Sequence, residues 1–307
     1  MKSSKSPLLA FALICSSVSA SPIIGGQNVT MVLENRATPT VVTAAILANM
    51  QLFAQYAAAA YCNADTNLVG SAVTCSNSAC PSISSVTNYA YLGYDQSEAT
   101  GFVSIDDTNK LIVVSYAGSD NLDNYIADLL VPLDTCDGNL VSGCKLHEGF
   151  QYAYEDVADT TLPAVKSAVA AYPTYSLVIT GHSLGGAVAT IAAAYLRVAG
   201  YPCDVYSYGS PRVGNEAFVN FMDAQAGSHY RVTHTTDPIP RYPAKLFGYR
   251  HTSPEFWLST GTSTTVDYAV GDIEVCTGIA NTDCNDGTSS VVTTPHSYYF
   301  EDISACR

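Results

Sequence analysis

The pentapeptide at residues 181–185 (GHSLG) makes Ser183 the best candidate for a nucleophile in this chain. Residues 176–180 (SLVIT) before it are typical of a buried strand, and the alanine-rich stretch after it is typical of a helix. In that context Gly-x-Ser-x-Gly predicts a nucleophile elbow, a strained strand-to-helix turn that presents the serine hydroxyl at the top of a sheet. Larger side chains at the two glycine positions would collide in so tight a turn. The alternative is an ordinary glycine-rich loop.

A serine nucleophile needs a general base, and the base needs a carboxylate that fixes its tautomer. After a nucleophile elbow the chain order is serine, then acid, then histidine. Asp237 fits the acid best because it directly follows a strand-like segment, residues 229–235. Ligands of open α/β sheets gather at the carboxyl ends of strands. The alternative for Asp237 is a turn-forming residue before a proline.

Four histidines follow Ser183, and two of them are plausible bases. His229 and His234 flank the strand-like segment that comes before the acid. His251 lies close after the acid and near aromatic residues, where it could be a structural, hydrogen-bonded histidine. His296 lies in a polar segment near the chain end (TTPHSYYF), from which a loop could bring it to the serine. Spacing alone favours His296 only modestly.

The tetrahedral intermediate of acyl transfer needs hydrogen-bond donors for its oxyanion. The backbone N–H of Leu184, the residue after the nucleophile, is one expected donor. Ser119 is the second candidate, because it ends an apolar strand-like run at a glycine turn. Its N–H, and its hydroxyl as well, could face the site. The alternative for Ser119 is a plain turn after a strand.

The segments around these residues alternate between helix and strand patterns, which predicts an α/β fold in a single domain. No internal repeat or low-complexity linker divides the chain. The helical patterns cover residues 41–60, 147–171 with a break near Pro163, 185–199 and 215–226. The strand patterns cover residues 88–107, 110–117, 176–180, 203–209 and 229–235.

The first 36 residues are expected to lie outside the folded domain. Residues 1–20 read as a secretory signal peptide, with two lysines, an apolar run too short to span a bilayer, and a small-residue cleavage site. Residues 21–36 are expected to be a short propeptide or leader, and residues 37–307 the catalytic domain. The protein is therefore expected to be secreted. No other stretch is apolar enough for a transmembrane helix.

Ten cysteines fit an oxidising compartment, and nine remain after the signal peptide. Cys62 and Cys306 lie at opposite ends of the mature chain, so joining them would tie down both termini. Cys203 is left over in an apolar strand pattern and is expected to be a buried thiol. No Cys-x-x-Cys pair or close Cys/His cluster indicates a metal site. The three local pairs are Cys75 with Cys80, Cys136 with Cys144, and Cys276 with Cys284.

Composition and charge restrict the classes of partner that the protein can bind. Apolar residues make up 48% of the chain and charged residues 13%, which indicates a well-filled core under a sparsely charged surface. The formal net charge of −14 argues against a nucleic-acid partner, because phosphate binding needs a basic face. The same charge disfavours electrostatic docking on an anionic membrane.

Eight segments in order resemble the fungal class 3 lipases, the triacylglycerol lipase family of filamentous fungi. The resemblance runs from about Thr38 to Cys306 and implies an α/β-hydrolase-like fold: a central, mostly parallel sheet with helices on both faces and a short helical lid. The segments are QLFAQYAAAAYC, VTCSNSACPSI, VVSYAGSDNLDNYIADL, ITGHSLGGAVATIAA, DVYSYGSPRVGN, HTTDPIPRYP, GYRHTSPEFW and PHSYYFEDISAC.

The resemblance implies a Ser183–Asp237–His296 triad, with His296 at the family's late His-x-x-Tyr-Phe motif. It implies oxyanion donors from Ser119 and Leu184. Cys276–Cys284 has no family counterpart that we can name. The disulfide pairs that the resemblance implies are Cys62–Cys306, Cys75–Cys80 and Cys136–Cys144.

The family's lid corresponds to residues 120–130 (DNLDNYIADLL), whose apolar residues recur at helical spacing. A closed lid would hide this face on the site, and an oil surface would stabilise the open form. Burial of ~200 Å² of apolar surface is worth on the order of 5 kcal/mol, ample to tip a two-state lid. The alternative is an ordinary amphipathic helix. The expected acyl-binding residues of the lid are Leu122, Tyr125, Ile126, Leu129 and Leu130.

Two departures from the family lie near this lid. The family usually has Phe-Arg-Gly before the oxyanion residue, and this chain has Tyr116-Ala117-Gly118. The missing arginine removes an anchor near the lid hinge. A lid tryptophan is common in these lipases, and here the position is Tyr125.

The leading hypothesis is a secreted, monomeric serine esterase that hydrolyses acylglycerol esters, of triacylglycerols or partial glycerides, at an oil–water interface without a cofactor. The alternative is a feruloyl or other soluble carboxylic-ester hydrolase on the same scaffold, and the apolar lid face favours the lipase. A third hypothesis is a non-catalytic binding protein with a relic elbow, and an intact triad in the correct order argues against it.

Overall fold

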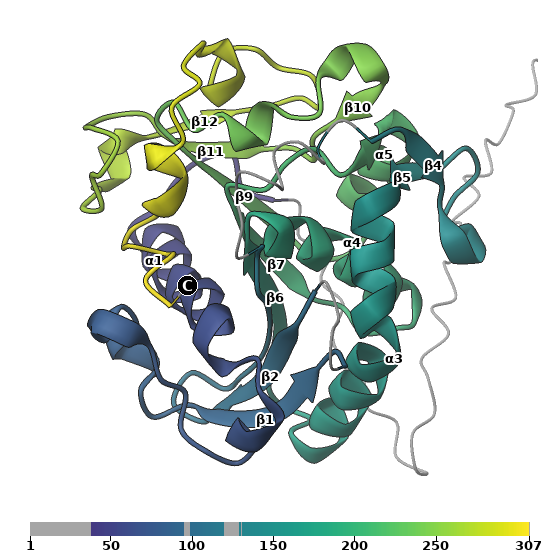
Figure 1. Cartoon of the computed structure of the whole chain (residues 1–307), viewed down its shortest axis with the longest axis vertical. Helices are drawn as coiled ribbons and strands as arrows, with labels where there is room; N and C mark the ends of the chain where they lie inside the picture. The colour runs from purple at the N-terminus through teal and green to yellow at the C-terminus, as the bar shows by residue number, and fades with distance from the viewer. Residues whose placement is uncertain (1–37, 95–98, 120–128, 130, 307) are drawn as a thin grey trace, which may run out of the picture. The chain divides into compact units, whose positions relative to one another are not determined.

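An eight-stranded, mostly parallel sheet forms the centre of the structure (Figure 1). The computed structural model describes residues 38–94, 99–119, 129 and 131–306. The order across the sheet is β1-β2-β3-β6-β7-β9-β11-β12. The strands from β3 to β11 in this order pair in parallel, and β1, β2 and β12 pair antiparallel with their neighbours. The bounds are β1 (Thr87–Leu92), β2 (Gly101–Asp106), β3 (Leu111–Tyr116), β6 (Ser176–His182), β7 (Asp204–Tyr208), β9 (His229–His234), β11 (Glu255–Leu258) and β12 (Ile273–Cys276).

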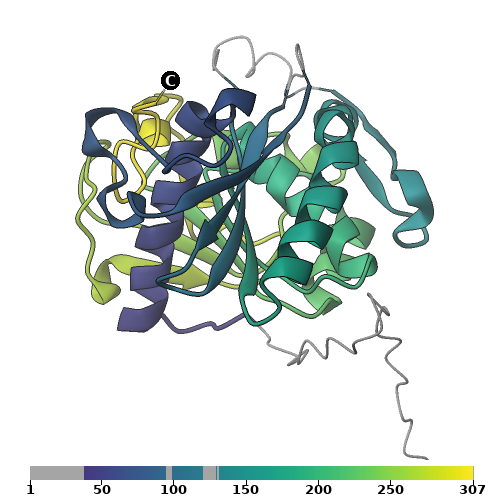
Figure 2. The same cartoon turned by 90° about the horizontal axis from the view of Figure 1, so that it is seen from below.

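Helices cover both faces of this sheet, as the family resemblance implies. The helix α1 (Ala44–Asn63) lies on one face, and α3 (Glu148–Ala171) and α4 (Leu184–Val198) lie on the other (Figures 1 and 2). The helix α5 (Glu216–Ala224) directly follows a strand of a second, four-stranded sheet. In the described part of the chain, none of the helices combines the length and the apolarity that crossing a membrane requires. The order of the second sheet is β10 (Tyr249–Arg250), β8 (Gly214–Asn215), β5 (Lys145–His147) and β4 (Leu133–Thr135).

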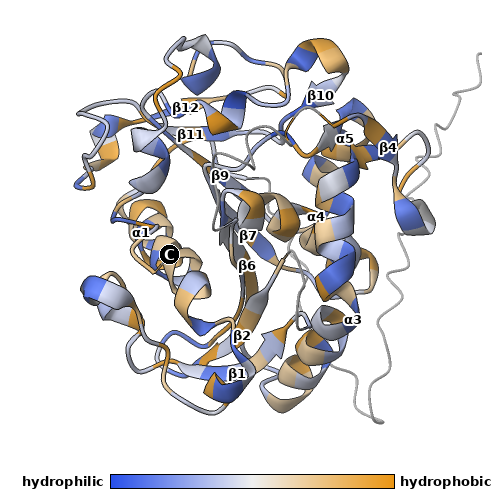
Figure 3. Ribbon diagram, viewed as in Figure 1, coloured by the Kyte–Doolittle hydropathy of each residue, from blue (hydrophilic) through white to orange (hydrophobic). Residues whose placement is uncertain are grey.

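The helix α4 is buried on almost every side because its side chains are small. Twelve of its fifteen residues are buried, and most of them are Ala, Gly or Val. A helix that is apolar all round belongs in the interior, and small side chains let it approach the sheet closely. Apolar residues run along α1 and α4 in Figure 3. The nucleophile elbow is therefore followed by a rigid, deeply packed helix.

Two expectations about elements need correction. The pattern over residues 88–107 predicts one strand, but the structure divides this stretch into the antiparallel pair β1 and β2. The predicted break near Pro163 is wrong, because α3 runs through it without interruption. A proline inside a helix costs ~3 kcal/mol through a lost hydrogen bond and a clash. The buried face of α3, which includes Phe150, Val157 and Val165, offsets that cost.

Four disulfide bonds connect the described cysteines other than Cys203. Cys62 of α1 is bonded to Cys306, next to the end of the chain, and the other bonds close short loops. Cys203 is buried, and its burial raises the pKa of the thiol to about 11, so the thiol stays protonated at neutral pH. The short-range pairs are Cys75–Cys80, Cys136–Cys144 and Cys276–Cys284.

Glu301 is a partly buried residue in the C-terminal segment. It lines a surface pocket together with Gln51 and Gln55 of α1. Its Oε1 is buried and has no hydrogen-bond partner among the described residues. Burial, and then the negative charge of Asp302, raises the pKa of Glu301 to about 9. We therefore expect this carboxyl to be protonated in the folded protein at neutral pH.

This raised pKa predicts a pH-dependent stability. The folded protein keeps a proton that the unfolded chain releases above its ordinary pKa of 4.5, so the contribution is full below pH 4.5 and is lost as the pH rises toward about 9. Glu301→Gln removes this titration and keeps the shape. We expect the stability of the variant relative to the wild type to rise between pH 5 and pH 9 by about 1–2 kcal/mol, discounted for partial exposure.

Thermal unfolding at several pH values measures this difference. The control is Glu274→Gln on β12, because Glu274 is exposed. If Glu301→Gln and the wild type keep the same difference in melting temperature at every pH, the carboxyl of Glu301 ionises normally and the prediction is wrong.

Candidate active site

Ser183 stands in a strained turn between β6 and α4. Its backbone angles are φ 59° and ψ −125°, a conformation that residues with a side chain rarely adopt. Its N–H donates a hydrogen bond to the carbonyl oxygen of Tyr208, at the end of β7, over 2.9 Å. Strain of this kind costs of order 1–3 kcal/mol and persists only where the surrounding structure enforces it. The serine therefore lies at the carboxyl ends of the parallel strands, in the geometry that the pentapeptide predicts.

The two glycines of the pentapeptide are required by backbone contact. A Cβ on Gly181 would lie 2.3 Å from the carbonyl carbon of Gly185. A Cβ on Gly185 would lie 2.2 Å from the carbonyl oxygen of Tyr116, at the end of β3. In both cases the obstacle is backbone, which cannot rotate away. The turn is therefore closed to any other residue at these positions.

Asp237 and His296 meet beside this turn. Asp237 follows β9, and His296 lies in a short 3₁₀ helix, Thr294–Ser297. The Nδ1 of His296 is 2.8 Å from Oδ2 of Asp237, and both side chains are fully buried. The N–H of Ile239 donates to Oδ1 of the same carboxylate over 3.0 Å. Since a carboxylate accepts hydrogen bonds, we assign the proton of the neutral imidazole to Nδ1, which leaves Nε2 as a base.

The two atoms that would exchange a proton in catalysis are both unsatisfied. Within the described residues, neither Oγ of Ser183 nor Nε2 of His296 has a hydrogen-bond partner, and both atoms are buried. The ring of His296 packs on the ring of His182, with centroids 4.5 Å apart, and His182 is the residue before the serine. Catalytic hydrogen bonds are often loose before substrate binds. The arrangement can therefore support attack by a serine that a histidine deprotonates.

Tyr299 is a partner of the acid that the sequence reasoning missed. Its O–H donates to Oδ2 of Asp237 over 2.5 Å. Burial, and then the charge of Asp237, raises the pKa of Tyr299 well above its usual value, so the phenol remains a neutral donor. Tyr299 lies just beyond the 3₁₀ helix that ends at Ser297, and sequence spacing gave no signal for its contact with Asp237.

The other histidines after Ser183 have different partners. Nε2 of His251 is 2.6 Å from the carbonyl oxygen of Pro240, and Nδ1 of His234 is 2.8 Å from that of Pro295. Nε2 of His229 is 3.1 Å from Oγ of Ser207. Burial lowers the pKa of all three, which keeps them neutral. Of the two histidines that the sequence left open, the structure brings His296 to Asp237.

His182, between the first glycine and the serine, joins three parts of the site. Its Nε2 is 2.8 Å from the backbone carbonyl oxygen of His296, so this nitrogen must carry a proton. Its Nδ1 is 2.8 Å from the hydroxyl of Tyr61 on α1. The elbow, the segment that carries the base and the first helix are thereby held together. Single-sequence spacing gave no signal for these contacts.

The expected oxyanion donors lie on adjoining segments. Leu184 is the first residue of α4, where backbone N–H groups lack partners within the helix. Ser119 is partly buried and follows Gly118, whose Cβ, if present, would lie 2.8 Å from the carbonyl oxygen of His182. The end of β3 thus passes directly against the elbow. The role of these two N–H groups stays a prediction.

Most of the expected lid lies outside the described residues. That applies to Leu122, Tyr125, Ile126 and Leu130. Leu129 is described and is fully buried. The lid and its acyl-binding face therefore stay predictions.

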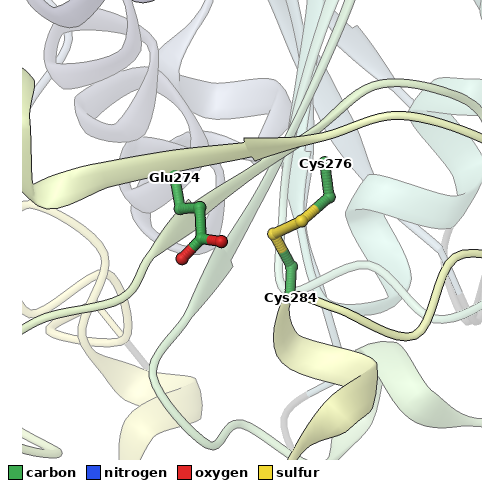
Figure 4. A group of neighbouring side chains, drawn as sticks. All are labelled: Glu274, Cys276 and Cys284. Carbon is green, nitrogen blue, oxygen red and sulfur yellow. A yellow bond between two sulfur atoms is a disulfide. The ribbon is translucent and has the colours of Figure 1, made fainter.

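Glu274, Cys276 and Cys284 are the only group in the described part of the chain that resembles a metal site. Their ligand-type atoms lie within 4.8 Å of one another. Figure 4 shows that the sulfurs of Cys276 and Cys284 are bonded to each other. Metals bind cysteine as the thiolate, and a disulfide sulfur is not one. The two cysteines of this group therefore form a covalent link.

The strain at Ser183 predicts an unusual order of stabilities. We expect Ser183→Gly to be more stable than Ser183→Ala by about 1 kcal/mol, because glycine adopts positive φ without strain. Ser104 in the middle of β2 provides the control, and there we expect glycine to be less stable than alanine by about 0.5–1 kcal/mol. Urea unfolding of the four variants measures both differences. A Ser183→Gly protein less stable than Ser183→Ala would show that the turn is unstrained.

Comparison with known proteins identifies a family. The Lipase (class 3) family matches residues 113–247, and the Lipase 3 N-terminal region matches residues 45–93. Secreted mono- and diacylglycerol lipase 1 of Fusarium solani is 46% identical over 302 residues, which is 97% of this chain and 89% of that protein.

Solved structures agree. The mono- and diacylglycerol lipase from Aspergillus oryzae superposes with a TM-score of 0.79 and 33% identity, over 87% of this chain and 100% of that one. A triacylglycerol lipase whose catalytic centre is described as a serine protease triad gives 0.75 and 25% identity, over 87% of this chain and 98% of that one. The fold is thus the α/β-hydrolase fold, and the chain belongs to the fungal class 3 lipases.

Proposed function

We propose that this protein is an extracellular lipase that hydrolyses acylglycerol esters with Ser183 as nucleophile, His296 as base and Asp237 as the acid. The observation that carries the proposal is the pairing of a strained, buried Ser183 with a His296 whose Nδ1 is hydrogen-bonded to Asp237. The names of the relatives, secreted mono- and diacylglycerol lipases, favour partial glycerides among the acylglycerols.

The first half of the reaction forms an acyl-enzyme. Nε2 of His296 accepts the proton of Ser183 as Oγ attacks the ester carbonyl carbon, and the carbonyl oxygen becomes an oxyanion. The N–H groups of Leu184 and Ser119 are the proposed donors to this oxyanion. His296 then gives its proton to the departing glycerol oxygen as the ester C–O bond breaks. Asp237 stabilises the imidazolium that forms between these two steps.

The second half returns the free enzyme. A water molecule gives a proton to Nε2 of His296 and attacks the acyl carbon. The bond to Oγ of Ser183 breaks, and the proton on His296 returns to the serine. The products are a fatty acid and an alcohol, and no other group enters the balance.

The proposed contact with lipid is based on apolar side chains that are exposed at the protein surface. Leu246 and Phe247 are 90% and 62% exposed, and Val291 and Val292, just before His296 in sequence, are 77% and 56% exposed. We propose that they help the protein to lie on an oil surface. The monomeric state stays a prediction.

The domain boundaries are also proposals. Residues 37–307 are taken as one catalytic domain. The signal peptide (1–20) and the leader (21–36) lie outside the described residues.

The triad predicts the effect of removing the nucleophile. Ser183→Ala leaves no atom to form the acyl-enzyme, so we expect kcat on p-nitrophenyl butyrate to fall by at least about 10⁴-fold. A fluorophosphonate probe should label the wild type once and should not label the variant. Full activity of purified Ser183→Ala protein would refute the triad.

Rates on dissolved and on emulsified substrate distinguish a lipase from a soluble esterase. A lipase with a lid should hydrolyse tributyrin faster once the concentration exceeds solubility, because an oil surface stabilises the open form. We expect a rise of about 10-fold or more across that limit, with slow cleavage of methyl ferulate. A flat response to the emulsion together with fast ferulate cleavage would favour the feruloyl esterase and exclude the lipase.

A further inference from the structure

The backbone that carries the acid is strained. Thr235, between β9 and Asp237, has a φ of 37°, which is unfavourable for a β-branched residue. The carbonyl oxygen of Thr235 accepts a hydrogen bond from Nε1 of Trp257 over 2.8 Å and another from Nδ2 of Asn285 over 3.1 Å. A strained turn persists only if its surroundings enforce it. These two donors are the side chains that hold the turn.

Asn285 also holds the acid itself. The same Nδ2 donates to the backbone carbonyl oxygen of Asp237 over 3.0 Å. One amide group therefore bridges the two carbonyls on either side of the turn. The carboxylate of Asp237 has its own partners in His296, Tyr299 and the N–H of Ile239. The side chain and the main chain of the acid are thus fixed by separate groups.

Asn285 is in turn fixed by the edge of the sheet. It is 1% exposed, and its backbone N–H donates to Oε1 of Glu255 on β11 over 3.2 Å. Glu255 also accepts from Oγ1 of Thr233 over 2.6 Å and from Nη2 of Arg231 over 3.0 Å. Thr233 and Arg231 belong to β9, the strand that leads to the acid. The network therefore ties Asn285 to the strand whose loop it supports.

The residues on each side of Asn285 have anchors of their own. Cys284 is bonded to Cys276 on β12 (Figure 4). Cys276 pairs with Glu255 of β11. Asp286 forms ion pairs with Arg212 and Lys245. Three consecutive residues are thus held by a covalent bond, a buried hydrogen bond and charged pairs. The side-chain amide of Asn285 is consequently presented in one position.

We propose that Asn285 is a positioning residue for catalysis, which holds the Thr235–Asp237 turn so that the carboxylate meets His296. The inference rests on the proposed role of Asp237 in the triad. Asn285 does not touch the reacting atoms, and it acts through the backbone of the acid. A catalytic group must be held within about 0.5 Å of its productive place, and the two hydrogen bonds from Asn285 hold the backbone that carries this one.

The proposal predicts a kinetic effect of Asn285→Ala on a soluble ester, p-nitrophenyl butyrate. We expect kcat to fall about 10–100-fold with KM changed less than about twofold, because substrate binding does not use this residue. A looser Asp237 stabilises the imidazolium of His296 less. The acid limb of the kcat/KM profile should therefore move to lower pH.

Asn63→Ala is the matched control. Asn63 is also 1% exposed, and its Nδ2 donates to the carbonyl oxygens of Ala59 and Thr74 over 2.8 and 2.6 Å. Both variants lose two amide-to-carbonyl bonds, and Asn63→Ala also loses the bonds that Oδ1 of Asn63 accepts from Thr74 and Asn88. Only Asn285 supports the acid. We expect Asn63→Ala to lose stability and to keep kcat and the pH profile of the wild type. Both are assayed well below their melting temperatures.

Active-site titration with a fluorophosphonate gives the concentration of competent serine, so each kcat refers to folded enzyme. If Asn285→Ala does not fold, Cys276→Ser/Cys284→Ser loosens the same segment and should lower kcat about 2–10-fold with the same shift of the acid limb.

Three outcomes would overturn the proposal. The first is an unchanged kcat and an unchanged acid limb in titrated Asn285→Ala enzyme, which would leave Asn285 with a structural role only. If Asn285→Ala does not fold, the same result in the double cysteine variant has the same meaning. An equal loss of kcat in Asn63→Ala would show general loosening. If the wild type itself is not labelled at Ser183, the proposed triad is wrong and this inference falls with it, a result distinct from the first two.

Discussion

Backbone contact across the elbow is the constraint on which the active site depends. The chain folds back so tightly around Ser183 that a single Cβ on Gly181 or Gly185 would overlap main-chain atoms. Such a turn is held only if the strand and the helix are both immovable. The parallel neighbours β3 and β7 hold β6, and the small side chains of α4 let it lie flat against the sheet. The strain at the serine is thus enforced by the most deeply buried part of the protein.

The acid and the base must reach this fixed point from distant parts of the chain. Asp237 and His296 are 59 residues apart, and they are held in place in different ways. The acid is carried by β9, a member of the same parallel sheet, so its position follows from the strand order. The base lies in a short 3₁₀ helix after a long irregular segment, where no strand can place it. Its position depends on side-chain contacts with Asp237 and His182.

This difference explains what the sequence could and could not predict. The elbow, β6 and α4 follow from local pattern, because strand, glycines and helix are adjacent in the chain. Asp237 follows from chain order and from the strand before it. His296 could not be separated from His251 by spacing, because irregular segments leave no periodic signal. Tyr299, His182 and Asn285 were missed for the same reason: their roles arise from contacts between residues that only tertiary structure brings together.

The polar groups of the site are unequally satisfied, and this inequality has a consequence for catalysis. The carboxylate of Asp237 accepts three hydrogen bonds, whereas Oγ of Ser183 and Nε2 of His296 are buried with no partner among the described residues. An unmade hydrogen bond of a buried group costs about 1–3 kcal/mol. Proton transfer from the serine to the histidine during attack on an ester uses these two atoms. The well-fixed groups around them thus hold these two buried atoms without another partner, so that they are available to each other and to the substrate when the reaction begins.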